Sequence, residues 1–277
     1  MKSFIYRQLK KPFFGRFMVR WRHPLPEAER SRWQPLRIAS ATGGTLAALY
    51  RQADGPGPPR ATLVLAHPMG KEAKGYFLKH GYAELLLQAG YNVLVFDFNG
   101  FGESSMGNFR FHEDVLAAGR AAQRVLPAPQ LGLLGISLGA EFGVVALASP
   151  GQPFGFAVLE SGATTLEEFW HRFPAARLAL AVLGRLLPRL RREVRMIDRM
   201  AEVRGLRSIL FIYSRTDAWV PFEMGGRYQA RCPVPSELYE VPEGVHAQLM
   251  KSPHAEAYRA HLLEYLQRQT APVAVPG

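Results

Sequence analysis

Short apolar runs alternate with segments of helical periodicity along most of the chain, and this alternation restricts the fold more than any other feature. Continuous apolar runs are typical of strands buried on both faces of a sheet. We predict an N-terminal antiparallel hairpin, of which 45–51 is the second strand, followed by strands over 61–66, 91–96, 131–134, 156–159, 208–213 and 237–241. We predict helices over 77–89, 111–124, 138–147, 221–230 and 254–269. This order indicates an α/β fold with a doubly wound, mostly parallel sheet.

The composition fits a globular protein with a large core. The chain has 277 residues, of which 48% are hydrophobic and 21% charged, which excludes disordered and collagen-like classes. Cys232 is the only cysteine, so no internal disulfide is possible. No apolar run approaches the ~18 to 20 residues that cross a bilayer, and the N-terminus has no signal-peptide pattern. We expect a cytoplasmic protein, with peripheral membrane association left open.

Two segments hold all the excess positive charge. Residues 1–33 carry nine Lys and Arg against two Glu, and residues 171–207 carry ten Arg against three acidic residues. The whole chain carries +11, so the remainder is slightly acidic. A nucleic-acid enzyme would carry basic charge on its main binding face, so we expect no nucleic-acid partner.

Residues 1–32 form a basic aromatic arm ahead of a domain over 33–277. The arm has near-helical apolar spacing, interrupted by Pro12 and Gly15. Aromatic residues beside cations suit an anionic membrane surface, which residues 1–30 could contact, but an arm docked on the domain explains the pattern as well. Both interpretations stay open.

An insertion of about 45 residues separates the strands over 156–159 and 208–213, longer than one crossover helix requires. Its apolar stretch over 178–187 is followed by Pro188 and a cluster of Arg. Insertions at the carboxyl edge of a parallel sheet lie over the ligand crevice, so we predict a helical lid over about 162–207. The apolar stretch would line an acyl pocket or only pack the lid on the body.

The segment Gly135-Ile-Ser-Leu-Gly139 directly follows one predicted strand and opens a helix. A nucleophile on such a sharp turn needs small neighbours, and its hydroxyl projects above the sheet at the helix N-terminus. We predict Ser137 as the nucleophile. The oxyanion would be held by the backbone N–H groups of Leu138 and Met69, with Gly70 as an alternative, because Pro68 has no N–H.

A serine hydroxyl needs a base, and the base needs an orienting acid. His246 follows the last predicted strand and Asp217 follows the strand before it, so both are expected on the same rim as Ser137. None of the other histidines combines a post-strand position with the order Ser, Asp, His. Glu160, which also ends a strand at this rim, is the alternative acid.

Four motifs in this order resemble the α/β-hydrolase superfamily, in its branch of esterases, acylglycerol lipases and serine aminopeptidase-like proteins. Besides the serine turn, the histidine loop and Asp217-Ala-Trp-Val-Pro221, the chain carries Asp97-Phe-Asn-Gly-Phe-Gly-Glu-Ser104. This last segment is similar to the family turn Asp-x-Arg-Gly-x-Gly-x-Ser. The resemblance covers about 33–269 and implies an α/β-hydrolase fold. Asn99 stands where the family usually has Arg, so we expect any ion pair that this Arg would make to be missing.

The expected function is cleavage of a carboxylic ester with an apolar acyl part, through an acyl-enzyme on Ser137, with a small-molecule substrate. No metal or organic cofactor is expected, because the histidines and the lone cysteine show no metal-ligand spacing. The motifs leave open a peptidase, a thioesterase or a non-catalytic membrane-associated binding protein of the same fold. They do not indicate an oligomeric state.

Overall fold

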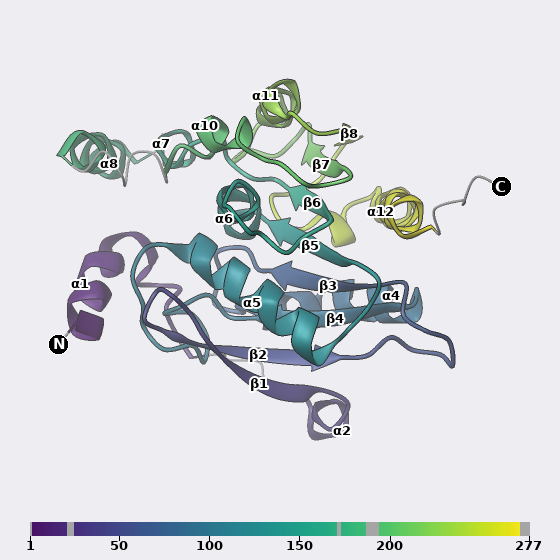
Figure 1. Ribbon diagram of the computed structural model, residues 1–277. Coiled ribbons are helices and arrows are strands. Elements are labelled where there is room, and N and C mark those ends of the chain that lie inside the picture. The colour runs from purple at the N-terminus through teal and green to yellow at the C-terminus, as the bar shows by residue number, and fades with distance from the viewer. Residues whose placement is uncertain (1, 21–24, 171–172, 187–193, 272–277) are drawn as a thin grey trace.

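A single eight-stranded sheet forms the centre of the protein in a computed structural model that describes residues 2–20, 25–170, 173–186 and 194–271 (Figure 1). The strand order is β1-β2-β4-β3-β5-β6-β7-β8. The strands are β1 (Gln34–Ala39), β2 (Thr45–Arg51), β3 (Ala61–Ala66), β4 (Tyr91–Phe96), β5 (Leu131–Ile136), β6 (Phe156–Glu160), β7 (Ile209–Ser214) and β8 (Ser236–Val241). β1 and β2 are antiparallel to their neighbours and the other pairs are parallel, which confirms the predicted fold class.

Every residue of β3 to β7 is buried, as their continuous apolar sequences predicted. Edge strand β8 is mostly half-buried. β5 and β6 extend beyond the predicted ranges, as far as Ile136 and Glu160. These longer strands bring the chain directly to Ser137, because the backbone N–H of Ser137 continues the ladder by donating to the carbonyl of Glu160 at 2.8 Å.

Helices cover both faces of the sheet. They are α1 (Lys2–Phe14), α2 (Glu27–Arg30), α3 (Gly75–Lys79), α4 (Tyr82–Gln88), α5 (Phe111–Val125), α6 (Leu138–Leu147), α7 (Leu166–Phe169), α8 (Pro174–Leu186), α10 (Met196–Met200), α11 (Glu223–Arg231) and α12 (Ala255–Thr270). Figure 1 shows α5 and α6 on one side of the sheet and α4 and α12 on the other. Each side has its own hydrophobic core. The described residues contain no helix long and apolar enough to cross a membrane.

Two helix predictions were wrong in detail. The helix expected over 77–89 is broken into α3 and α4, because Gly81 takes a left-handed conformation with φ 79° between them. The arm was expected to be interrupted at Pro12, but α1 continues through that position and ends at Phe14. Gly15 follows directly after the helix and donates its backbone N–H to the carbonyl of Lys11 at 2.9 Å, where a Cβ would lie 2.5 Å from that oxygen.

The arm is docked on the domain. Phe14 is buried and its ring meets those of Phe101 and Phe111 edge-on, at 6.0 and 5.7 Å between centroids. Lys10 is fully buried and its ammonium donates to the side-chain oxygen of Asn99. Helix α1 thus places a lysine against the turn that contains Asn99.

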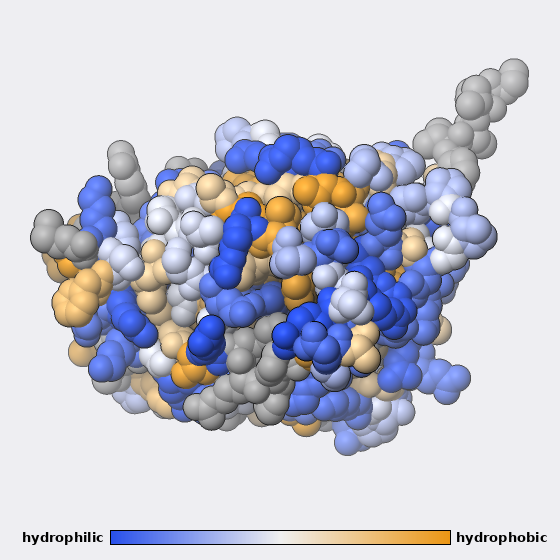
Figure 2. Space-filling view, turned by 90° about the horizontal axis from the view of Figure 1, so that it is seen from below, coloured by the Kyte–Doolittle hydropathy of each residue, from blue (hydrophilic) through white to orange (hydrophobic). Residues whose placement is uncertain are grey.

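The predicted insertion over 162–207 comprises α7, α8 and α10 in its described part, and Figure 1 shows α7 and α8 at the same end of the sheet as α1. Its arginine cluster, Arg189, Arg191 and Arg192, lies outside the described residues. Its role as a lid stays a prediction. The face seen in Figure 2 is mostly hydrophilic, with apolar residues in scattered patches.

Candidate active site

Ser137 lies on a strained turn between β5 and α6. Its φ of 52° and ψ of −113° are unusual for a residue with a side chain, and strain of this kind is concentrated at functional sites. Both flanking positions must be glycine, because backbone carbonyl oxygens lie where a Cβ atom would be. A Cβ at Gly139 would overlap the carbonyl oxygen of Ala66, and a Cβ at Gly135 would lie 2.5 Å from the carbonyl oxygen of Gly139. The turn therefore tolerates no larger residue at either glycine.

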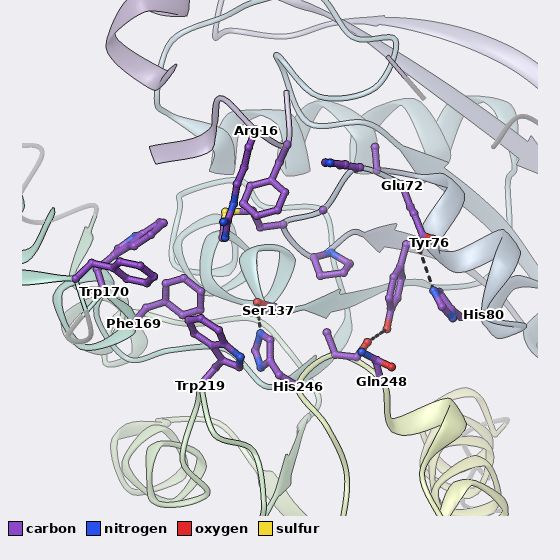
Figure 3. A pocket seen from close by; sticks show the side chains of 18 residues that line it. Arg16, Glu72, Tyr76, His80, Ser137, Phe169, Trp170, Trp219, His246 and Gln248 are labelled. Carbon is purple, nitrogen blue, oxygen red and sulfur yellow. Dashed lines mark hydrogen bonds and ion pairs between the residues drawn. The ribbon is translucent and has the colours of Figure 1, made fainter. Parts of the chain in front are cut away.

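The structure brings the three predicted triad residues together in one hydrogen-bonded chain. Ser137 Oγ lies 2.8 Å from Nε2 of His246 (Figure 3). On the other side of the ring, Nδ1 of His246 lies 2.7 Å from Oδ2 of Asp217. The Asp217 carboxylate accepts at Oδ2, which requires a proton on Nδ1 of His246 and leaves Nε2 free to accept from the serine hydroxyl. This is the tautomer that a general base for Ser137 needs.

Asp217 is held from its own loop. Its side chain is fully buried, and Oδ1 accepts backbone N–H bonds from Trp219 at 2.8 Å and Val220 at 3.0 Å. These bonds leave Oδ2 for the imidazole of His246. The carboxylate therefore has both oxygens satisfied and a fixed orientation.

The loop that carries His246 is fixed on both sides. Ahead of it, the backbone N–H of Gly244 donates to the Thr216 hydroxyl at 3.0 Å. Behind it, Ala247 has a φ of 52°, and its carbonyl accepts from the Tyr76 hydroxyl at 2.7 Å. Tyr76 thus connects α3, on the other side of the pocket, to the histidine loop.

The two predicted oxyanion donors border the serine. Leu138 is the first residue of α6, so its N–H is one of those that have no partner within the helix. Met69 lines the same pocket as Ser137. His67 orients the peptide of Met69, because its Nε2 accepts from the N–H of Phe98 at 3.1 Å and its Nδ1 then donates to the carbonyl of Pro68 at 2.8 Å. The N–H of a trans peptide points opposite to its carbonyl, so the Met69 N–H points away from buried His67.

Glu160, the alternative acid, lies with two tyrosines. Its Oε2 accepts from the hydroxyl of Tyr258 at 2.6 Å and from that of Tyr82 at 3.2 Å, on the core side of the sheet edge. Complete burial raises the pKa of Glu160 to about 7. His246 contacts Asp217 instead, so the geometry favours Asp217 as the orienting acid.

A cavity of about 400 Å³ opens above Ser137 and has two unlike sides (Figure 3). One side is aromatic, and its residues are Phe169, Trp170, Phe173 and Trp219. The other side is polar, with Glu72, Tyr76, His80 and Gln248. In the part of the chain that the structure describes, no three His, Cys, Asp or Glu side chains are grouped so that they could hold a metal ion.

Several lining residues were not singled out from the sequence. Arg16 and Phe17 of the arm border the pocket, and so does Glu72, which accepts from His80 at 2.9 Å and from Lys79. The basic aromatic composition of the arm was the only local signal for the first two. Nothing near Glu72 in the sequence indicates that it faces Ser137.

A mostly parallel sheet with a serine on a strained strand-to-helix turn, hydrogen-bonded to a histidine at the same edge, defines a serine hydrolase of the α/β-hydrolase class. Within that class, the chain belongs to the serine aminopeptidase S33 family, whose model matches residues 57–246. No curated protein matches the sequence.

Solved structures of several hydrolases are similar to this chain. An esterase from Pyrococcus furiosus has a TM-score of 0.72 at 19% identity, over 91% of this chain and 97% of that one. A serine hydrolase without a lid from Xanthomonas campestris has a TM-score of 0.64 at 17% identity, over 91% and 100%. An acylaminoacyl peptidase from Pyrococcus horikoshii has a TM-score of 0.64 at 16% identity, over 89% of this chain but only 43% of the peptidase. At these identities the similarity shows the fold.

Proposed function

We propose that the protein hydrolyses carboxylic esters with an apolar acyl part, with Ser137 as nucleophile, His246 as general base and Asp217 as the acid that orients the imidazole. The observation that carries this proposal is the unbroken chain of 2.8 and 2.7 Å contacts from the serine hydroxyl to a buried carboxylate. Such a chain activates a hydroxyl that is otherwise a weak nucleophile.

The proposed reaction has two halves. As Ser137 Oγ attacks the ester carbonyl, its proton passes to Nε2 of His246, and the N–H groups of Met69 and Leu138 stabilise the negative oxygen. The imidazolium, stabilised by Asp217, then protonates the leaving alcohol. Water deprotonated by His246 attacks the acyl-enzyme, and collapse of the second tetrahedral state returns the proton to Ser137 and releases the acid.

The aromatic side of the cavity supports an apolar acyl group. Phe169, Trp170 and Phe173 belong to the segment over 162–207, which we propose to act as a lid on a catalytic domain formed by residues 33–277. The rings of Phe173 and Trp219 are stacked at 6.5 Å between centroids and 15° between planes. Flat apolar walls of this kind favour an alkyl or aryl chain over a hydrated one.

The nucleophile is tested by a Ser137→Ala variant with a fluorophosphonate probe and a p-nitrophenyl ester. We expect wild-type protein to be labelled and to turn over the ester, and Ser137→Ala to lose labelling and at least about 10³-fold of the turnover. Ser31→Ala, at an exposed serine, should behave as wild type. Undiminished ester turnover by Ser137→Ala would refute the assignment.

The alternatives have distinct outcomes in the same assays. Faster cleavage of aminoacyl anilides than of p-nitrophenyl esters would indicate a peptidase, and a preference for acyl thioesters would indicate a thioesterase. Absence of both labelling and turnover in wild-type protein would indicate a binding protein that keeps the fold.

We further propose that helix α1 touches an anionic membrane surface. Its side chains Phe4, Ile5 and Leu9 are 66%, 48% and 54% exposed, and cations flank them. A triple substitution of Lys2, Arg7 and Lys11 by Gln removes these charges and leaves buried Lys10 in place. We expect wild-type protein to sediment with anionic liposomes at low salt and the triple variant to remain in solution. Equal sedimentation of the two proteins would contradict membrane contact through α1.

A further inference from the structure

The arm is attached to the domain by the buried side chain of Lys10. The ammonium of Lys10 reaches the side-chain oxygen of Asn99 and lies 4.1 Å from the ring centroid of Phe111. The amide nitrogen of Asn99 in turn donates to Asp114 at 2.7 Å. A buried ammonium is costly unless it is solvated by such partners, so this contact specifies one position for α1 on the domain.

The turn that follows α1 is determined by the helix. The N–H of Gly15 donates to the carbonyl of Lys11 at 2.9 Å, and the N–H of Phe17 donates to the carbonyl of Phe14 at 2.8 Å. Buried Phe14 lies in the core beneath this turn. Arg16, between these residues, is therefore carried to a defined place at the pocket instead of extending freely into solvent.

Arg16 faces the reacting serine from across the pocket. Both Arg16 and Phe17 line the cavity that contains Ser137, and Figure 3 shows the Arg16 side chain extending from the arm into it, on the side away from His246. The guanidinium lies 4.6 Å from the ring centroid of Phe17, which supports it from one side. Among the described residues, no carboxylate lies within 4 Å of the Arg16 guanidinium.

The other charged residues that line the pocket leave the Arg16 guanidinium as its main charge. Among the described residues that line the cavity, Glu72 is the only carboxylate. It already accepts from Lys79 and His80, and against the opposing effect of burial these contacts lower its pKa. It is thus poorly placed to bind a substrate ammonium. Lys71 adds a second exposed cation to the rim. The pocket therefore attracts anions and does not attract a free amino group.

We propose that Arg16 is a specificity-determining residue that binds an anionic group, a carboxylate in the simplest case, on the substrate whose carbonyl is attacked by Ser137. The inference rests on the proposed ester hydrolysis and names its substrate class: esters that carry a negative charge near the cleaved bond. The arm then belongs to the active site, because it supplies the charged wall of the pocket.

Matched ester pairs test this proposal. In the first pair, 4-nitrophenyl pentanoate is compared with the mono-4-nitrophenyl ester of glutaric acid, in which a carboxylate replaces the terminal methyl group. In the second pair, phenyl pentanoate is compared with 4-carboxyphenyl pentanoate, which places the charge on the alcohol. We expect wild-type protein to prefer the anionic member of one pair by about tenfold in kcat/KM, a typical effect of one charge-assisted hydrogen bond.

Arg16→Gln should abolish the preference, measured as the ratio of kcat/KM for the anionic ester to kcat/KM for its neutral partner. Arg16→Lys, which keeps the charge, should retain part of the preference. Arg7→Gln is the matched control, because Arg7 is an exposed arginine of the same arm, on helix α1, and is not among the residues that line the pocket. No preference in either pair, or a preference that Arg16→Gln leaves unchanged, would overturn the inference while ester hydrolysis stands. Wild-type protein that cleaves neither neutral nor anionic esters would overturn the proposed function as well.

Discussion

At the scale of single residues, the site depends on two glycines, Gly135 and Gly139, at which there is no room for a Cβ atom. The strained backbone of Ser137 is accessible because Gly139 lets the start of α6 approach the end of β3 without a side chain between them. Gly135 allows the same approach from the strand side. The spacing of these glycines around the serine is a consequence of this packing, and it explains why a five-residue pattern could indicate a three-dimensional turn.

A single added methyl group at Gly139 should disable the enzyme. A Cβ there would overlap the Ala66 carbonyl oxygen, so we expect Gly139→Ala to destabilise the fold by several kcal/mol, roughly the upper range for backbone strain and overpacking, and to abolish ester turnover. Gly226→Ala in α11 is the control, because a Cβ at that position meets no atom within 4 Å and should be neutral or slightly stabilising. Urea unfolding of both variants provides the measurement, and equal stability of the two would contradict this account of the turn.

At the scale of elements, the N-terminal arm is a helix whose position is set by a partner distant in sequence. Lys10 and Asn99 are 89 positions apart, yet the buried contact between them joins α1 to the turn after β4. Met18, beyond the helix, lies against Gly100 of the same turn, where a Cβ would come within 2.7 Å of the Met18 methyl group. The arm and the turn thus fit each other over more than one contact.

Replacing Lys10 should loosen α1. Lys10→Met keeps the length of the side chain but removes the donor to Asn99, and we expect a loss of about 1 to 3 kcal/mol together with faster proteolytic removal of the arm. Lys11→Met changes the exposed neighbouring residue and should leave the proteolysis rate unchanged. The measurement is the rate at which limited trypsin digestion releases the N-terminal fragment, with each variant corrected for its own cleavage sites. An arm that stays equally protected in both variants would show that Lys10 does not hold it.

At the scale of the whole molecule, two hydrophobic cores on either side of the sheet also bury acidic groups. Glu141 in α6 is fully buried, accepts from the N–H of Ala163 at 3.3 Å, and has its pKa raised by burial to about 8. Glu160 at the end of β6 is similarly buried, with a pKa raised to about 7. Both are expected to carry protons in the folded protein at pH values where the unfolded chain has lost them.

The contribution of Glu141 to stability should therefore fall as the pH rises from about 5 to 8. Glu141 has an ordinary pKa of 4.5 when unfolded and about 8 when folded, so the unfolded state binds fewer protons in this interval. Its contribution to stability is fully present below pH 4.5 and is lost as the pH rises through 8, at a slope of roughly 1 kcal/mol per pH unit. Glu141→Gln should remove this contribution, so that its stability falls less with rising pH than that of wild type, as measured by urea unfolding at pH 5, 6, 7 and 8. Exposed Glu256→Gln should keep the wild-type slope, and a wild-type slope in Glu141→Gln would count against a protonated Glu141.

Local patterns were sufficient to predict most of the sheet and the positions of Ser137, Asp217 and His246. Apolar runs predict strands because every residue of a strand buried on both faces of a sheet must be apolar. In a parallel sheet, the carboxyl ends of the strands meet at one edge. Loops after β5, β7 and β8 must therefore converge, wherever their residues stand in the chain. The break between α3 and α4 escaped prediction because either conformation of Gly81 agrees with the surrounding sequence.

Only the tertiary structure decided what surrounds the serine. The choice between Asp217 and Glu160 depended on which carboxyl meets the imidazole and which meets Tyr258, and both residues end strands at the same rim. The docking of α1 through Lys10, and with it the presence of Arg16 in the pocket, depended on contacts between segments far apart in the sequence. Such contacts produce no repeating pattern in the sequence. A single hydrogen-bonding partner is enough to offset the desolvation of a buried polar group, and that partner can stand anywhere along the chain.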